Sequence, residues 1–468
     1  MPPTNKALVL STPKSPTQSI LPAPYSHPSA GELVIKTHAV AMNPADWGIQ
    51  RLGILIPESE YPIILGCDIA GEVVELPSGR DENASDENAW LKRFKIGDRV
   101  IGQTGPLFTK EAKDIDLSGD GLDVWKDKKI YAYAAFQEYV VLKGPLIARI
   151  PDNITYKDGA VLPLGIATAA SCLFPPTMLN LDFPPADRKA APNGKILLVW
   201  GASSSVGSCG VQIAMQAGYT VVGICSARNF GMVEGLGAVK CFDHNSASIV
   251  EDVVGYLKAE HEGKEVAGAY DGISTAPTLT SLCEILHRLS GTGIKTRKFI
   301  ASVYPGAEAH AIHDVEIIVN LTQGMDQFYR IAGQARDWLE GAMQHGRVAC
   351  APEKDIVGNG LEAVQGAMDR LAEGKCQKFR QKSPKKNTGY NAFSTLSFPT
   401  SPMALPGAEN ITPTFNLRDD TERQNKVESF PVLNSSIAPM DFQRDTNDVR
   451  KSDTRNDTGG LEIFAIAS

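Results

Sequence analysis

Long apolar runs, paired cysteines and an excess of positive charge are all missing from this chain of 468 residues. No stretch approaches the roughly 20 consecutive apolar residues that a membrane span needs. The N-terminal residues also lack the basic and then apolar pattern of a signal peptide. We therefore expect no membrane partner and a cytoplasmic location.

The eight cysteines are scattered and form no C-x-x-C pair. This spacing argues against both a disulfide framework and a structural zinc site. Lys and Arg number 46 against 54 Asp and Glu, a net charge of −8, which argues against a nucleic-acid partner. Hydrophobic residues make up 43% and charged residues 21%, as in a globular protein, and the length suggests two or three domains.

The chain changes character along its length. The first third has short runs of β-branched and apolar residues separated by Gly and Pro, typical of a β-rich domain: residues 32–37, 71–75, 98–101 and 136–141. Further on, short apolar strands alternate with helical segments, which is the pattern of a parallel sheet: residues 196–200, 220–224, 239–242 and 299–303. Residues 362–373 predict one last amphipathic helix.

A small-residue turn after residues 196–200 is the most informative segment. It runs from Gly201 through Ser203, Ser204, Ser205 and Val206 to Gly207. Small residues let the backbone approach a pyrophosphate, and a helix N-terminus offers free N–H groups to it. Taken alone, the segment fits a plain strand-to-helix turn equally well.

The end of the next strand adds the context that the turn lacks. A protein that binds NAD usually has an acidic residue about 20 residues further on, where it binds the ribose hydroxyls. This chain has Ser226, Arg228 and Asn229 there instead. A hydroxyl and a guanidinium suit a 2′-phosphate, which a carboxylate would repel. NADPH is therefore favoured over NADH, although Arg228 also fits a solvated turn residue.

With these residues in hand, the chain resembles the medium-chain dehydrogenase/reductase superfamily. It resembles most the zinc-independent enoyl reductase and quinone oxidoreductase branch, and within it the fungal stand-alone enoyl reductases that are often labelled zinc-binding alcohol-dehydrogenase-like. Several motifs carry this resemblance in the family's order: residues 43–47 (NPADW), 65–71 (LGCDIAG), 97–100 (GDRV), Leu162-Pro163 with Thr168-Ala169, and 201–207 (GASSSVG).

The resemblance implies an α/β protein in which a GroES-like β-rich catalytic domain accompanies a Rossmann domain with a doubly wound parallel sheet. We expect the catalytic domain over residues 1–160, the Rossmann domain over 161–315 and a return to the catalytic domain over 316–380. Residues 381–468 would form a disordered or aberrant tail, since they are polar and show no sustained period.

The same motifs indicate whether the protein binds a catalytic zinc ion. Zinc-dependent relatives have Gly-His-Glu where this chain has Gly66-Cys67-Asp68, and an upstream Cys near the place of Asn43–Asp46. A catalytic zinc normally takes three protein ligands, and the matching motifs offer no partner for Cys67. We therefore expect no metal, with Cys67 a buried packing residue.

The resemblance implies a reductase that transfers a hydride from NADPH to an activated C=C bond. The small-molecule acceptor would be an enone, an enoyl thioester or a quinone. A quinone reductase shares the whole scaffold and is the second interpretation, and a catalytically inactive nucleotide-binding protein is the third. The resemblance leaves open an acyl-carrier partner, and both a monomer and a homodimer.

The resemblance also implies where each cofactor contact lies. Pro44, Ala45, Asp46, Trp47 and Thr168 would lie near the nicotinamide, and the 201–207 turn near the pyrophosphate. Ser226, Arg228 and Asn229 would bind the 2′-phosphate. His244 would lie near the adenosine, and Leu286 and His287 near the adenine or ribose. His244 fits a solvated loop and His287 a helix face equally well. No residue is assigned as proton donor; Tyr61, Tyr131, Tyr133 and His38 are candidates.

Two departures from the family pattern stand out. Relatives commonly have a cofactor-binding Lys where this chain has Gly48. Relatives also end in a Gly-Lys-x-Ser-Gly segment and a closing strand, whereas here Gly374-Lys375 leads into Cys376 and the polar tail. A missing strand would expose a sheet edge. Two interpretations fit this ending: a genuine disordered extension, or non-coding sequence translated through a splicing or gene-prediction error.

Overall fold

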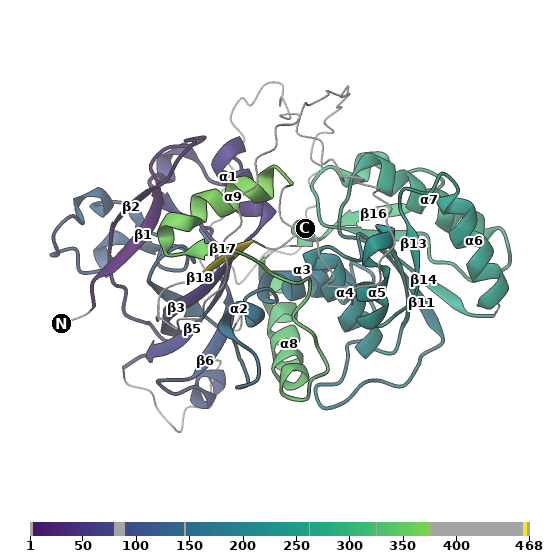
Figure 1. Cartoon of the computed structure of the whole chain (residues 1–468), viewed down its shortest axis with the longest axis horizontal. Coiled ribbons are helices and arrows are strands. Elements are labelled where there is room, and N and C mark those ends of the chain that lie inside the picture. The colour runs from purple at the N-terminus through teal and green to yellow at the C-terminus, as the bar shows by residue number, and fades with distance from the viewer. Residues whose placement is uncertain are drawn as a thin grey trace, which may run out of the picture. The chain divides into compact units, whose positions relative to one another are not determined.

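The computed structural model describes residues 3–78, 89–144, 147–261, 263–323, 325–374 and 462–465. These residues form two main sheets with the helices around them (Figure 1). No helix in the described part of the chain is long and apolar enough to cross a membrane.

The first main sheet belongs to the β-rich catalytic part. Its strands run in the order β10-β6-β5-β3-β18-β17, with β9 pairing β3. The bounds are β3 Glu32–Met42, β5 Asp68–Glu75, β6 Arg99–Gln103, β9 Tyr139–Lys143, β10 Ile147–Arg149, β17 Asp355–Asn359 and β18 Glu462–Ala465. The long strand β3 is the centre of this sheet, since it pairs with β5, β9 and β18.

Smaller elements cover this sheet. They are β1 Asn5–Leu10, β2 Ser19–Ala23 and β4 Ile63–Ile64 in a three-stranded sheet, β7 Lys110–Glu111 with β8 Lys129–Ile130, and the helices α1 Pro44–Leu52 and α2 Tyr156–Gly159. Side chains from β1, β3, β5 and β9 form one hydrophobic core with Val364, Ala367, Met368 and Leu371 of α9 (Val364–Ala372). Helix α9 thus packs against the catalytic part, although it comes late in the sequence.

The second main sheet is parallel, with strand order β13-β12-β11-β14-β15-β16. This is the doubly wound order 3-2-1-4-5-6 of a Rossmann fold, as the sequence predicted. The bounds are β11 Lys195–Trp200, β12 Thr220–Cys225, β13 Ala238–Asp243, β14 Glu265–Asp271, β15 Phe299–Ser302 and β16 Glu316–Val319. Its helices are α4 Ser205–Gln216, α5 Phe230–Gly235, α6 Ile249–Glu260 and α7 Ala276–Ser290.

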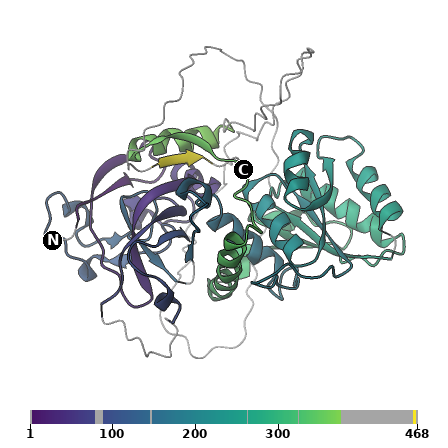
Figure 2. The ribbon, with the colours of Figure 1, turned by 60° about the horizontal axis from the view of Figure 1, so that its bottom comes forward.

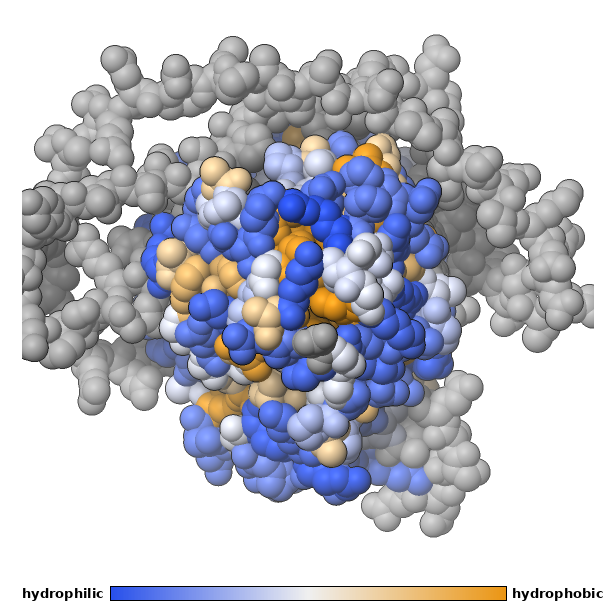
Figure 3. Space-filling model, turned by 90° about the vertical axis from the view of Figure 1, so that its right-hand side faces the viewer, coloured by the Kyte–Doolittle hydropathy of each residue, from blue (hydrophilic) through white to orange (hydrophobic). Residues whose placement is uncertain are grey.

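Helices bury both faces of the parallel sheet. On β11, Leu197 and Val199 belong to one hydrophobic core, while Ile196 and Leu198 belong to another on the opposite face. Successive side chains of a strand point to opposite faces, so a strand covered on both sides must be apolar throughout. The face seen in Figure 3 is mainly hydrophilic, with hydrophobic residues in small separate areas.

Two helices connect the sheets. Helix α3 (Pro163–Leu173) packs against α4 and also against α8 (Met325–Gln344), which contacts β10. Arg149 of β10 binds Glu340 of α8 through its guanidinium, with an N···O distance of 2.7 Å. Both views of the ribbon show α8 beside α3 (Figures 1 and 2).

The boundaries differ from the expected ones at two places. Strand β16 (316–319) belongs to the parallel sheet, so the Rossmann sheet extends past residue 315. Residues 462–465 were expected to lie in a disordered or aberrant tail, but they form β18 between β3 and β17. The closing strand is therefore present and comes from far beyond residue 375; the rest of the expected tail lies outside the described residues.

Candidate cofactor and substrate site

The turn between β11 and α4 is tightly folded. Ser204 is the N-cap of α4, and its hydroxyl oxygen accepts a hydrogen bond from the Gly207 N–H at 3.1 Å. Gly201 has a φ of +69°, in the left-handed region that favours glycine. A Cβ atom on Gly207 would lie 2.1 Å from the Gly201 carbonyl oxygen. The backbone at Gly201 and the backbone at Gly207 therefore lie so close together that position 207 has no room for a side chain.

The start of α4 has the chemistry to hold a phosphate. The helix has 12 residues, and its first N–H groups have no partner within the helix. The side-chain oxygen of Ser205 is buried and has no hydrogen-bond partner among the described residues. An unpartnered hydroxyl at a helix N-terminus fits the pyrophosphate of a dinucleotide, which would supply the missing acceptor.

The end of β12 lies directly beside this turn. The Asn229 amide donates to the Ser203 hydroxyl at 2.9 Å. The Ser226 hydroxyl and the His244 ring nitrogen Nε2 are 3.1 Å apart. Arg228 lies between them in sequence and is exposed. The structure thus brings Ser203, Ser226, Asn229 and His244 together, and residues 226–229 include no carboxylate.

A third loop, which sequence analysis missed, completes this edge of the sheet. After β14, Asp271 Oδ1 accepts hydrogen bonds from the Ile273 and Ser274 N–H groups, both at 2.9 Å. Burial raises the pKa of Asp271 to about 6, although these hydrogen bonds act in the opposite direction. Ile273 packs so close to Gly201 that a Cβ there would lie 2.5 Å from Ile273 Cγ1. The available signal was a run of small residues between a strand and the helix that starts at Ala276.

Leu286 and His287 are not brought to this edge. Both lie toward the end of α7, which starts after β14 and runs back along the sheet. Leu286 is fully buried in the core, and the His287 ring stacks on His313 with centroids 4.3 Å apart. The expected contact of these two residues with the adenine or ribose therefore has no support in the geometry.

On the catalytic side, α1 carries Pro44, Ala45, Asp46 and Trp47. Asp46 accepts hydrogen bonds from the backbone N–H groups of Asn43, at 2.8 Å, and Gly66, at 3.1 Å. The Asn43 amide in turn donates to Asp68 Oδ2 at 3.0 Å. Asp46 is completely buried. It therefore holds the start of α1 against the Gly66 turn.

Asp46 and Asp68 form a buried acid pair linked by Asn43. Desolvation raises the pKa of each carboxyl to about 7. The second oxygen of Asp68 accepts from the Leu164 N–H of α3 at 2.7 Å. This bond ties the catalytic sheet to the helix that carries Thr168, which is half-buried.

Asp46, Cys67 and Asp68 lie together but are poorly suited as zinc ligands. Burial and the two neighbouring carboxyls raise the pKa of the Cys67 thiol well above its ordinary value. A zinc ligand must be deprotonated, and the raised pKa values make deprotonation of all three groups harder than for exposed ones. Among the described residues, no three His, Cys, Asp or Glu side chains are grouped so as to hold a metal.

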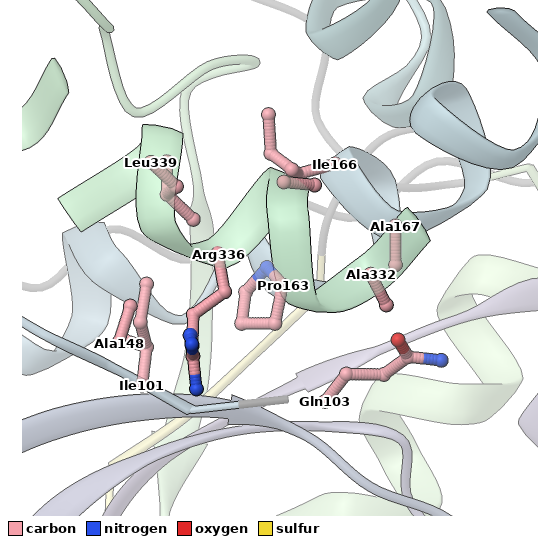
Figure 4. A pocket seen from close by; sticks show the side chains of 10 residues that line it. Ile101, Gln103, Ala148, Pro163, Ile166, Ala167, Ala332, Arg336 and Leu339 are labelled. Carbon is pink, nitrogen blue, oxygen red and sulfur yellow. The ribbon is translucent and has the colours of Figure 1, made fainter. Parts of the chain in front are cut away.

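A small cavity of about 30 Å³ lies between β6, α3 and α8 and is lined on α3 by Pro163, Ile166 and Ala167 (Figure 4). Apolar side chains line most of it, and Gln103 and Arg336 contribute its polar atoms. Gln103 Oε1 and Arg336 Nη1 are buried without a hydrogen-bond partner among the described residues. The volume suffices for a water molecule, which needs roughly 10–15 Å³ and two or more polar partners.

Comparisons with known proteins agree with this architecture. The alcohol dehydrogenase GroES-like domain family matches residues 29–152. The chain is 34% identical to the dehydrogenase pigH of Monascus ruber over 399 residues, which cover 80% of this chain and 97% of the relative. It is 32% identical to the trans-enoyl reductase himH of Aspergillus japonicus, over 77% of this chain and 93% of the relative.

The fold is also that of a solved structure. An alcohol dehydrogenase superfamily protein from Novosphingobium aromaticivorans superposes with a TM-score of 0.55 at 20% identity, covering 81% of this chain and 98% of its own. Together with the GroES-like sheet, the Rossmann sheet and the phosphate turn, these relatives show that the chain belongs to the medium-chain dehydrogenase/reductase superfamily of oxidoreductases.

Proposed function

We propose that this protein is an NADPH-dependent, zinc-independent reductase that transfers a hydride to the activated C=C bond of a small enoyl substrate. The observation that carries the proposal is the group of Ser203, Ser226, Arg228 and Asn229 beside the N-terminus of α4, without a carboxylate at the end of β12. The similarity to a trans-enoyl reductase supports the choice of substrate.

The cofactor's two phosphate regions would bind at different parts of this edge. The pyrophosphate would lie on the first N–H groups of α4, within reach of the unpartnered Ser205 hydroxyl. The 2′-phosphate would lie against Ser226, Arg228 and Asn229, where an arginine offers a two-pronged set of donors. A ribose 2′-hydroxyl of NADH would find no carboxylate among residues 226–229.

The catalytic side supports reduction of a double bond over alcohol oxidation. An alcohol dehydrogenase of this superfamily uses zinc to stabilise an alkoxide. Burial raises the pKa of the acid pair and of Cys67, so these groups lose their protons less readily and suit that metal poorly. NADPH, when bound, supplies the hydride. The chain then has to orient the acceptor, exclude water and stabilise the charge that forms on the conjugated carbonyl.

Cofactor choice provides the first test. Purified protein is titrated with NADPH and with NADH, following nicotinamide fluorescence, in parallel with Arg228→Ala. Losing a charge-assisted contact costs about 1.5–3 kcal/mol, which corresponds to roughly a 10- to 100-fold weaker NADPH affinity. NADH affinity should not change. The control is Arg188→Ala, since Arg188 is exposed and pairs with Asp187 away from this edge.

Turnover then separates the candidate reactions. NADPH oxidation is followed with an enoyl thioester, an enone and a quinone as acceptors. Equal affinity for the two cofactors would contradict the assignment of the 2′-phosphate site. Turnover of the quinone alone would favour a quinone reductase, and NADPH binding without turnover of any acceptor would favour an inactive nucleotide-binding protein.

A further inference from the structure

An aromatic cluster lies between the catalytic sheet and α8. We define it as Phe108, Tyr133, Phe328 and Tyr329. The Phe108 ring lies 5.8 Å from the Tyr329 ring and 6.3 Å from the Tyr133 ring, and Phe328 lies 6.1 Å from Tyr329. Phe108, Phe328 and Tyr329 are all partly exposed. Sequence analysis named only Tyr133 of these four.

The aromatic cluster is connected to both halves of the candidate site. Phe108, Phe328 and Tyr329 pack against Ala167, the residue before Thr168 on α3. On the other side, the loop that carries Phe108 begins at Thr104, whose N–H donates to the Cys67 carbonyl at 2.8 Å. Cys67 is hydrogen-bonded to Asp46, at the start of α1. The cluster is therefore next in sequence and packing to the part of α3 that carries Thr168, an expected nicotinamide residue.

The hydroxyl groups of the tyrosines are not equivalent. Tyr133 donates to Glu32 Oε1 at 2.5 Å, and Tyr131 donates to the Glu60 carbonyl at 3.1 Å. Both hydroxyls are therefore committed to the fold, which removes them as proton donors. Tyr61 is buried in the small N-terminal sheet, where its hydroxyl is enclosed without a partner among the described residues.

Tyr329 is the tyrosine of the aromatic cluster whose hydroxyl is not committed to the fold. It is partly exposed, and its hydroxyl has no hydrogen-bond partner in the described part of the chain. Burial alone raises its pKa above the ordinary phenol value. The phenol is therefore neutral at physiological pH, and its O–H is available as a donor.

We propose that the Tyr329 hydroxyl donates a hydrogen bond to the conjugated carbonyl oxygen of the acceptor and stabilises the enolate that forms there. This inference rests on the proposed function. When a hydride adds to the β-carbon, the π pair of the C=C bond forms a new double bond between the α-carbon and the carbonyl carbon, and the π pair of the C=O bond moves onto the carbonyl oxygen. The phenol meets that charge without losing its proton. The α-carbon then takes a proton from water, and the carbonyl re-forms.

The test removes this one oxygen atom and keeps the ring. Tyr329→Phe preserves the contacts with Phe108 and Phe328, so a purely structural role predicts no change. Loss of one such donor typically lowers kcat by about 100-fold or more, and we expect at least a 10-fold loss with unchanged NADPH affinity. Tyr61→Phe is the matched control. Its hydroxyl also has no partner among the described residues, but it is enclosed in the core of the catalytic part and not packed against α3, which removes Tyr61 from the candidate proton donors.

A second readout does not need turnover. The probe 4-(dimethylamino)cinnamaldehyde absorbs at longer wavelength when its carbonyl accepts a hydrogen bond. Its absorption band should shift to the red on binding to the unchanged protein and to Tyr61→Phe, and less on binding to Tyr329→Phe. Equal band positions in all three proteins, or no binding of the probe, would overturn the role of Tyr329.

Turnover and the absorption shift of the probe together distinguish a failure of the proposed function from a failure of the role of Tyr329. If the unchanged protein binds the probe with a red shift that Tyr329→Phe loses, but oxidises no NADPH with any acceptor, the proposed function fails and the carbonyl contact stands. If the unchanged protein reduces enones and Tyr329→Phe does so equally fast, the function stands and this inference fails.

Discussion

Replacing Gly207 by alanine tests whether the close backbone approach in the phosphate turn is what builds the cofactor site. The new Cβ would lie 2.1 Å from the Gly201 carbonyl oxygen and 2.7 Å from its carbonyl carbon. Both are backbone atoms, so no side chain can rotate away to relieve the clash. Gly201 is itself held against Ile273. The first turn of α4 must therefore move.

The size of the effect follows from this geometry. Overpacking a tight site costs about 1–3 kcal/mol of folding free energy. Displacing the helix N-terminus also removes one or two hydrogen bonds to the pyrophosphate, each worth about 1.5–3 kcal/mol with a charged acceptor. We expect the NADPH dissociation constant to rise at least about 10-fold, at 1.4 kcal/mol per factor of ten.

A matched helical glycine provides the control. Gly255 lies on the exposed face of α6, and a Cβ there would meet nothing within 4 Å. Gly255→Ala should stabilise the protein by about 0.5–1 kcal/mol and leave NADPH affinity unchanged. Urea unfolding and a fluorescence titration measure both quantities. The reasoning would be refuted if Gly207→Ala bound NADPH as tightly as Gly255→Ala.

Three further changes test other parts of the structure. Because burial raises the pKa of Asp46 and Asp68 from 3.8 to about 7, the folded protein retains protons that the unfolded chain releases, and stability should fall as pH rises from about 4 to 7. In Asp68→Asn, stability should decrease less with pH than in the unchanged protein. If the urea midpoint changes with pH equally in the two proteins, the prediction is wrong. Gly48→Lys introduces the lysine expected from the family pattern at a buried position of α1, where a Cβ would lie 3.4 Å from Ile54 Cδ1. It should tighten NADPH binding in the fluorescence titration, and an unchanged affinity would contradict a cofactor contact at this position. Phe464→Pro removes a backbone N–H from β18, which pairs with β3 on one side and β17 on the other. The carbonyl left without this donor should lower the free energy of unfolding by roughly 1–3 kcal/mol. An unchanged urea midpoint would show that β18 adds little to stability.

Local patterns in the sequence predicted the elements that carry strong signals. The runs 196–200 and 220–224 are β11 and β12 almost to the residue, because strands buried on both faces read as continuous apolar stretches. The turn at residues 201–207 is also predictable from the sequence, because its small residues directly follow one another between a strand and a helix. The hydrogen bond between Ser203 and Asn229, which the structure adds, joins the short β11–α4 and β12–α5 connections.

What the sequence could not predict depends on contacts between distant segments. Strand β14 was missed because its sequence EVAGAYD is rich in small residues, with Gly268 at a φ of +123°. The family resemblance alone implies a cofactor contact for Leu286 and His287, and their place toward the end of α7 depends on where that helix begins, which no local pattern gives. The Asn43 bridge between Asp46 and Asp68, and the meeting of Phe108 with Tyr329, join segments that no local pattern connects.

The pairing of β3 with the late strand β18 affects how the protein folds during synthesis. Residues 39–42 of β3 pair in parallel with residues 462–465, which the ribosome adds more than four hundred residues later. At roughly 5–20 residues per second, the N-terminal sheet waits about 20 to 80 seconds for this strand. Until then the edge of β3 next to Asn43 and the acid pair stays unpaired, and such edges invite aggregation. The β-rich half of the protein should therefore depend on chaperones during synthesis, whereas the Rossmann sheet, whose strands all lie between residues 195 and 319, can form as soon as they emerge.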